Sequence, residues 1–141
     1  MTHVLPEIST GPRPDVHILF ADDDPGMRAL VVTNLEAEGF RVTTAEDGSS
    51  ALDQIEQSRP DLIVLDVMMP GRDGLDVLRE VRARPDLAGI PVVLLTARAT
   101  DVDVWEGWKA GADYCMTKPF KPEDLSNFAH SILDAGVGVA Q

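Results

Sequence analysis

Several polar residues in the sequence could support metal or phosphate chemistry, because each lies at or just beyond the end of a short apolar segment. They are Asp22, Asp23, Asp66, Thr96 and Lys118. If the acids meet, two carboxylates about 4 Å apart repel by about 4 kcal/mol at an effective dielectric constant near 20, so a cation is needed. A small set of oxygen ligands favours Mg²⁺ over Zn²⁺, which prefers nitrogen and sulfur, and over Ca²⁺, which takes a fuller oxygen cage.

Other sites for metal or phosphate do not fit the residues. In a calcium-binding loop starting at Asp22, the fifth position is Gly26 and the sixth is Met27, where a ligand and then a glycine are required. The sequence also lacks G-x-G-x-x-G after the first apolar segment and has no G-x-x-x-x-G-K-[ST] motif.

The elements that carry these residues follow a regular alternation. Five short apolar segments, predicted as strands, are separated by stretches of helical period, and the segments are 17–21, 41–45, 62–65, 91–95 and 114–116. Strands that are apolar throughout and followed by helices predict a parallel sheet covered on both faces. The fold class is therefore a doubly wound α/β fold, in which the functional crevice lies at the carboxyl ends of the strands.

The first and last helices have the clearest boundaries. Asp24 before Pro25 is typical of a helix N-cap, and Gly39 predicts the end of that helix. Its expected buried face consists of Met27, Leu30, Val31 and Leu35. Pro122 is expected to open the last helix, and its apolar stripe is Leu125, Phe128, Ala129, Ile132 and Leu133.

Composition bounds the class of protein. The 141 residues fit one domain, predicted at 15–134 with a mobile tail at 1–14 and a short tail at 135–141. A net charge of -12 argues against direct binding of nucleic acid. No segment suggests a membrane span or signal peptide, and the lone Cys115 agrees with a reducing compartment, so we expect a cytoplasmic protein.

Four motifs in order give the chain a family resemblance over about residues 15–134. They are "ILFADDDPGMR", "PDLIVLDVMMPGRDG", "PVVLLTAR" and "AGADYCMTKPF". With them the chain resembles the receiver domain of two-component response regulators, the CheY-like superfamily. The resemblance implies a flavodoxin-like five-stranded sheet in the order 2-1-3-4-5. It also implies a signalling switch that accepts a phosphoryl group from a histidine kinase or a histidine phosphotransfer protein.

The resemblance assigns roles around the acids. It implies that Asp66 is the phosphoacceptor, and that Asp23, Asp66 and the backbone carbonyl of Met68 hold Mg²⁺. Asp22 would act mainly through bound water.

Other roles lie further along the chain. Thr96 and Lys118 would contact the phosphoryl oxygens, and the Lys118–Pro119 peptide bond would be cis. Met68 and Arg98 occupy positions that tune the lifetime of the phosphoryl group in the family.

One residue departs from the family pattern. Receivers usually carry Tyr or Phe at the position of Cys115, whereas here the aromatic residue is Tyr114, which strand alternation points to the opposite face. We therefore expect switching to rely on Thr96 and the loop after the fourth strand, with a smaller rearrangement at Cys115 or an adjustment of the fourth helix.

Surfaces for partners are less sharply defined. Trp108 is expected in the core, whereas Trp105 and Tyr114 are candidates for the surface made by the fourth helix, the fifth strand and the fifth helix, where receivers commonly form homodimers. Candidate residues for choosing the kinase are Met27, Arg28, Val31 and Lys121.

Two alternatives remain open. The receiver could be one module of a longer transcription factor or hybrid kinase. A phosphohydrolase with an aspartyl nucleophile of the haloacid dehalogenase type would need a second acid two residues after Asp66, where the sequence has Met68. We expect a phosphoacceptor with slow autodephosphorylation and not a metabolic enzyme.

Overall fold

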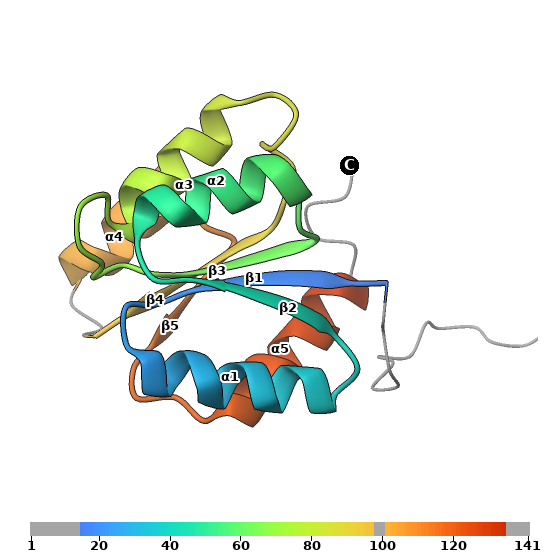
Figure 1. Ribbon diagram of the computed structural model, residues 1–141. Helices are drawn as coiled ribbons and strands as arrows, with labels where there is room; N and C mark the ends of the chain where they lie inside the picture. Colours follow the sequence, from blue (N-terminus) through green and yellow to red (C-terminus); the bar gives the residue numbers. More distant parts are fainter. Residues whose placement is uncertain (1–14, 98–100, 135–141) are drawn as a thin grey trace, which may run out of the picture.

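Strands and helices alternate along the part of the chain that the computed structural model describes, residues 15–97 and 101–134, with the backbone alone for 101–105 (Figure 1). The elements are β1 His17–Ala21, α1 Pro25–Ala37, β2 Arg41–Ala45, α2 Gly48–Ser58, β3 Leu62–Asp66, α3 Gly74–Ala83, β4 Val92–Thr96, α4 Asp101–Ala110, β5 Tyr114–Thr117 and α5 Pro122–Asp134. The predicted tails, 1–14 and 135–141, lie outside the described residues. Within the described part, no helix is both long enough and apolar enough to cross a bilayer.

The five strands form one parallel sheet in the order β2-β1-β3-β4-β5, which confirms the predicted fold. Helices α1 and α5 cover one face, and α2, α3 and α4 cover the other (Figure 1). In register, Ala21 of β1 lies beside Leu65 of β3, so Asp22, which follows β1, and Asp66, the last residue of β3, lie next to each other. The parallel topology thus brings the predicted site to one edge of the sheet.

Alternate residues of the central strands fill two cores. Leu19 and Ile63 pack toward α2, α3 and α4, while Phe20 and Val64 pack toward α1 and α5, and all four are fully buried. Each such side chain contributes about 1.5–3 kcal/mol through the burial of its apolar surface. Because both faces are covered, these strands read as continuous apolar runs in the sequence.

Helix α1 begins and ends as its sequence predicts. The Asp24 carboxylate accepts hydrogen bonds from the backbone N–H of Gly26 at 2.9 Å and of Met27 at 3.4 Å, and Pro25 is the first helical residue. Gly39 follows the helix with a φ of 95°, a conformation that suits glycine. Asp24 therefore caps the helix, which leaves Asp22 and Asp23 for other roles.

The predicted buried face of α1 is wrong at one position. Val31 and Leu35, four residues apart, are buried, whereas Leu30 is 51% exposed. Leu30 precedes Val31 by one residue and is therefore rotated by about 100° around the helix, which turns it to solvent.

The prediction that Trp108 packs in the core is also wrong, since its side chain is 45% exposed. Gly107 of α4 faces the sheet, where an added Cβ would lie 2.9 Å from Leu94 Cδ1. Because Gly107 has no side chain, the backbone of α4 packs directly against the sheet at this position. The next residue, Trp108, points away from the sheet and is exposed.

Candidate metal and phosphate site

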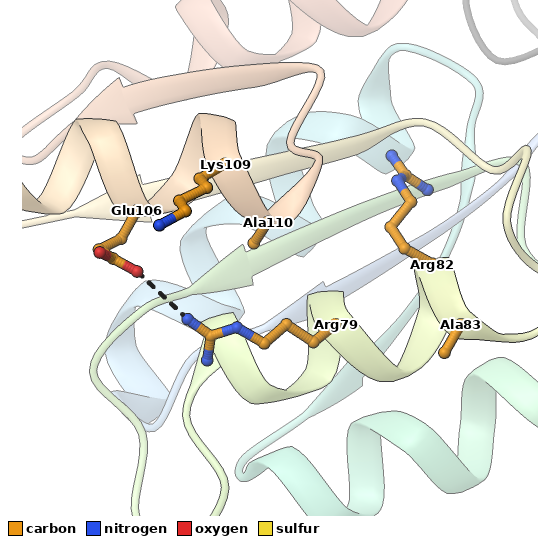
Figure 2. Close-up of a pocket in the computed structure, with 6 residues that line it drawn as sticks. All are labelled: Arg79, Arg82, Ala83, Glu106, Lys109 and Ala110. Carbon is orange, nitrogen blue, oxygen red and sulfur yellow. Dashed lines mark hydrogen bonds and ion pairs between the residues drawn. The ribbon is translucent and has the colours of Figure 1, made fainter.

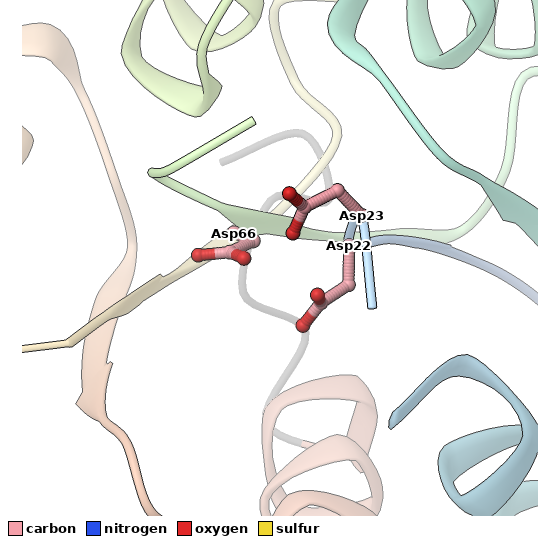
Figure 3. A group of neighbouring side chains, drawn as sticks. All are labelled: Asp22, Asp23 and Asp66. Carbon is pink, nitrogen blue, oxygen red and sulfur yellow. The ribbon is translucent and has the colours of Figure 1, made fainter. Parts of the chain in front are cut away.

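Three carboxylates gather where β1 and β3 end (Figure 3). Asp22 and Asp23 directly follow β1, and Asp66 is the last residue of β3. One carboxylate oxygen from each residue lies within 4.8 Å of those from the other two. Asp22 and Asp66 are only 0% and 3% exposed, whereas Asp23 is exposed.

Lys118 joins this cluster from the segment after β5. Its Nζ lies 2.8 Å from Asp22 Oδ2 and 3.0 Å from Asp66 Oδ2. The Lys118 backbone N–H donates to the Thr96 carbonyl oxygen at 2.7 Å, which ties this segment to the end of β4. The Lys118–Pro119 peptide bond is cis, as the resemblance implies.

The charges in the cluster perturb one another. Burial raises the pKa of Asp66, the Lys118 hydrogen bond opposes this shift, and the negative charge of Asp22 adds to it. Burial alone would lower the pKa of Lys118, but its hydrogen bonds to Asp22 and Asp66 outweigh that effect and raise the pKa. Lys118 therefore keeps its positive charge. Among the described residues it is the one cation that forms ion pairs with this group of three acids, and it pairs with Asp22 and Asp66.

The remaining oxygens fit a hard divalent cation. Asp22 Oδ1 accepts from the Asp24 N–H at 3.0 Å, so both of its oxygens have protein donors. Within the described residues, the Asp23 carboxylate makes no hydrogen bond or ion pair. An exposed carboxylate without a partner, facing two buried ones, is a donor set that suits Mg²⁺ or Mn²⁺.

Gly74 is a residue of the site that sequence reasoning missed. An added Cβ there would lie 2.4 Å from the Asp66 backbone oxygen, so the start of α3 can approach the end of β3 only with glycine. The Gly74 N–H donates to the Val67 carbonyl at 3.0 Å, which closes the intervening loop. The available signal was the Asp73 cap followed by glycine at the first position of the helix.

Two other predicted site residues, Thr96 and Met68, also lie at the carboxyl ends of the strands. Thr96 ends β4 and is buried, and Met68 is 67% exposed, with its N–H donating to Asp66 Oδ1 at 3.2 Å. Arg98 and the side chain of Trp105 lie outside the described residues.

Cys115 and Tyr114 point to opposite faces of β5, as the strand alternation predicted. Tyr114 stacks on Phe128 of α5 with ring centroids 4.4 Å apart. Cys115 packs with the core under α4, where a Cβ on Gly107 would lie 3.0 Å from its Sγ. Burial raises the pKa of the Cys115 thiol, which agrees with an unreactive cysteine.

A groove of about 570 Å³ lies between α3 and α4, and charged residues along it join the two helices (Figure 2). Arg79 Nη2 lies 3.4 Å from Glu106 Oε1 across it. At its other end, Arg82 donates to the carbonyls of Gly111, Ala88 and Ile90 and pairs with Asp113 at 2.8 Å. These charges are therefore used to join the two helices and the adjoining loops.

Comparison with known proteins identifies the kind of domain. Residues 18–130 match the family described as response regulator receiver domain. The DNA-binding response regulator MtrA of Mycolicibacterium smegmatis is 45% identical over 108 residues, which are 77% of this chain and 46% of that protein. The chain thus matches about half the length of this relative.

Solved structures share the fold over nearly their whole length. A putative response regulator from Chloroflexus aurantiacus superposes with a TM-score of 0.79 at 33% identity, covering 84% of this chain and 97% of that one. The Mn²⁺-bound form of response regulator Rcp1 gives a TM-score of 0.72 at 28% identity, covering 89% and 97%.

Proposed function

The chain belongs to the response regulator receiver domain family, and from this premise we propose that it is a phosphoacceptor switch whose acceptor is Asp66. The donor is a sensor histidine kinase or a histidine phosphotransfer protein. The observation that carries the proposal is the pairing of Lys118 with buried Asp22 and Asp66, beside an exposed Asp23 that has no partner among the residues described by the structure. Since such kinases present their phosphohistidine in the cytoplasm, we propose that the chain acts there.

Asp23, Asp66 and the Met68 carbonyl would hold Mg²⁺ in this proposal. Asp22, whose oxygens accept hydrogen bonds from Asp24 and Lys118, would contribute through bound water, as the family resemblance implies. When bound, the cation supplies positive charge that offsets the charge on the transferred phosphoryl oxygens. The related response regulator Rcp1 has a Mn²⁺-bound form, which supports the binding of a divalent cation by this chain.

The chain's own residues perform the transfer. A lone pair on an Asp66 carboxylate oxygen forms the new O–P bond while the P–N bond of the phosphohistidine breaks, and the bonding pair leaves with the imidazole nitrogen. Lys118 donates to a phosphoryl oxygen, and the Thr96 hydroxyl donates to another. These groups stabilise charge by position, which is the main requirement of phosphoryl transfer.

Phosphorylation then changes the surface that partners meet. The phosphoryl group of an aspartyl phosphate carries about 1.5–2 negative charges in place of the single charge of the carboxylate, and this added charge draws Thr96 and Lys118 toward it. We propose that the loop after β4 and helix α4 adjust against Cys115, and that the surface of α4, β5 and α5 alters its contacts. Tyr114 and Trp108 are 40% and 45% exposed there, which suits a homodimer or a protein target.

The output of the whole protein is part of the proposal. Relatives such as MtrA are named as DNA-binding regulators and extend beyond the matched region. We propose that this acidic domain does not itself contact nucleic acid, and that it acts alone by docking or as the receiver of a longer regulator or hybrid kinase.

The proposal is tested by incubating the chain with a small acyl phosphate and Mg²⁺ and measuring its intact mass. The wild type should gain one phosphoryl group, and Asp66→Ala should gain none. Rapid hydrolysis of phosphomonoesters by the wild type would instead favour a phosphohydrolase.

A further inference from the structure

Arg28, the fourth residue of α1, reaches back to the acid cluster. Its Nη1 donates to the backbone carbonyl oxygen of Asp22 at 2.8 Å. This carbonyl belongs to the peptide bond that joins Asp22 to Asp23. The orientation of that peptide sets the position of the Asp23 Cα atom and the direction of its side chain.

The rest of this short segment is also anchored. The Asp22 N–H donates to the Ala45 carbonyl of β2 at 3.0 Å, and the Arg28 N–H donates to the Asp24 carbonyl at 3.0 Å. The Asp24 N–H donates to the Asp22 carboxylate. Hydrogen bonds thus fix both sides of Asp23, and Arg28 fixes the peptide immediately before it.

We infer that Arg28 is a positioning residue that holds the Asp22–Asp23 peptide so that the Asp23 carboxylate is directed at the divalent cation. This inference rests on the proposed metal-dependent function. Groups that orient metal ligands commonly change metal affinity by about 10–100-fold when they are removed. Arg28 touches no ligand oxygen, so its effect passes through the backbone.

A purely electrostatic role predicts the opposite sign. If the guanidinium only compensates the negative acids, its removal leaves a more negative site and tightens cation binding by about twofold. If it positions Asp23, its removal weakens binding.

The experiment titrates Mn²⁺ alone and follows the electron paramagnetic resonance signal of the free aqueous ion. We expect Arg28→Met to weaken binding by about tenfold. Arg28→Lys keeps the charge and part of the reach, so about threefold weaker binding is expected. The control is Arg79→Met, which removes the same charge from the groove between α3 and α4 and should change the affinity by less than about twofold.

The Mg²⁺ dependence of phosphorylation by an acyl phosphate gives a second readout. In Arg28→Met the half-saturating Mg²⁺ concentration should rise, while the rate at saturating Mg²⁺ stays within about twofold of the wild type. If Arg28→Met does not fold, the Mn²⁺ affinity of Arg28→Lys tests the inference instead. A Mn²⁺ affinity of Arg28→Lys equal to that of the wild type then overturns the inference.

The outcomes separate the two proposals. If Arg28→Met binds Mn²⁺ as well as the wild type does, or more tightly, the positioning role of Arg28 is contradicted. The proposed phosphoacceptor function is not affected by that result. A wild type that binds Mn²⁺ but gains no phosphoryl group contradicts the proposed function, and the titration still decides the role of Arg28. A wild type that binds no Mn²⁺ overturns both.

Discussion

The ammonium group of Lys118 lies between two carboxylates, 2.8 Å from Asp22 Oδ2 and 3.0 Å from Asp66 Oδ2. Asp22 is fully buried, and its carboxylate is paired with this ammonium group. The pair joins residues 96 positions apart and links the segment after β1 to the segment after β5. Lys118 is therefore important for stability as well as for the proposed chemistry.

Replacing Lys118 with Met should destabilise the fold by about 3 kcal/mol without divalent cations, because it leaves a buried carboxylate without its counter-ion. Urea denaturation at neutral pH measures the change. Lys109→Met, which removes an exposed lysine of α4, is the control and should cost less than about 0.5 kcal/mol. If Lys118→Met lowers the free energy of unfolding by less than about 1 kcal/mol, burial of the Asp22 carboxylate does not depend on the ammonium group.

Asp23→Asn should stabilise the metal-free protein by about 1 kcal/mol, because it removes one of three neighbouring negative charges. Mg²⁺ at ten times its dissociation constant should stabilise the wild type by about 1.4 kcal/mol. This gain should be much smaller in the variant, which lacks a ligand. Thermal unfolding with Mg²⁺ and with a chelator checks both, and equal gains in the two proteins would exclude Asp23 as a ligand.

The thiol of Cys115 should report the movement of α4. The chain has one cysteine, and α4 packs against it at Gly107, so labelling by a thiol reagent should be slow. Acyl phosphate with Mg²⁺ should accelerate labelling in the wild type but not in Asp66→Asn. Gly107→Ala should accelerate it without phosphorylation, because the added methyl meets both Leu94 and Cys115. Unchanged labelling on phosphorylation would place the switch elsewhere.

His17 should make the fold less stable in mild acid. Its ring is buried, and Nε2 lies 2.9 Å from Thr43 Oγ1. Burial lowers the pKa of His17, Arg41 adds to this shift, and Asp61 opposes it.

The sign follows from proton linkage. Below the ordinary pKa of 6.5, the unfolded chain binds a proton that the folded chain resists, so stability falls as the pH drops. His17→Gln should lose less stability than the wild type between about pH 7.5 and about pH 5.5, as measured by denaturation at each pH. Parallel losses in the two proteins would contradict this.

The fold and the centre of the site were predictable because both follow from strong local patterns. Continuous apolar strands indicated a sheet covered on both faces, and parallel strands necessarily bring Asp22 and Asp66 to one edge. The position of Lys118 after the fifth strand placed it at the same end of the sheet, and the resemblance supplied the strand order and the role of this lysine.

Features that depend on tertiary approach were not predictable. Leu30 and Trp108 are apolar residues whose exposure depends on the exact rotation of α1 and α4. Position 74 requires glycine because a Cβ there would lie 2.4 Å from the backbone oxygen of Asp66. Arg28 contacts the backbone carbonyl of Asp22, and no sequence pattern predicts that contact.

The central claim is that Asp66 accepts the phosphoryl group with the help of a divalent cation. Its most direct measurement is peptide mapping by tandem mass spectrometry after incubation with an acyl phosphate, with Mg²⁺ or with a chelator. We predict one phosphoryl group on Asp66 in the Mg²⁺ sample and almost none in the chelator sample. A phosphoryl group on another residue, or equal labelling in both samples, would contradict the account.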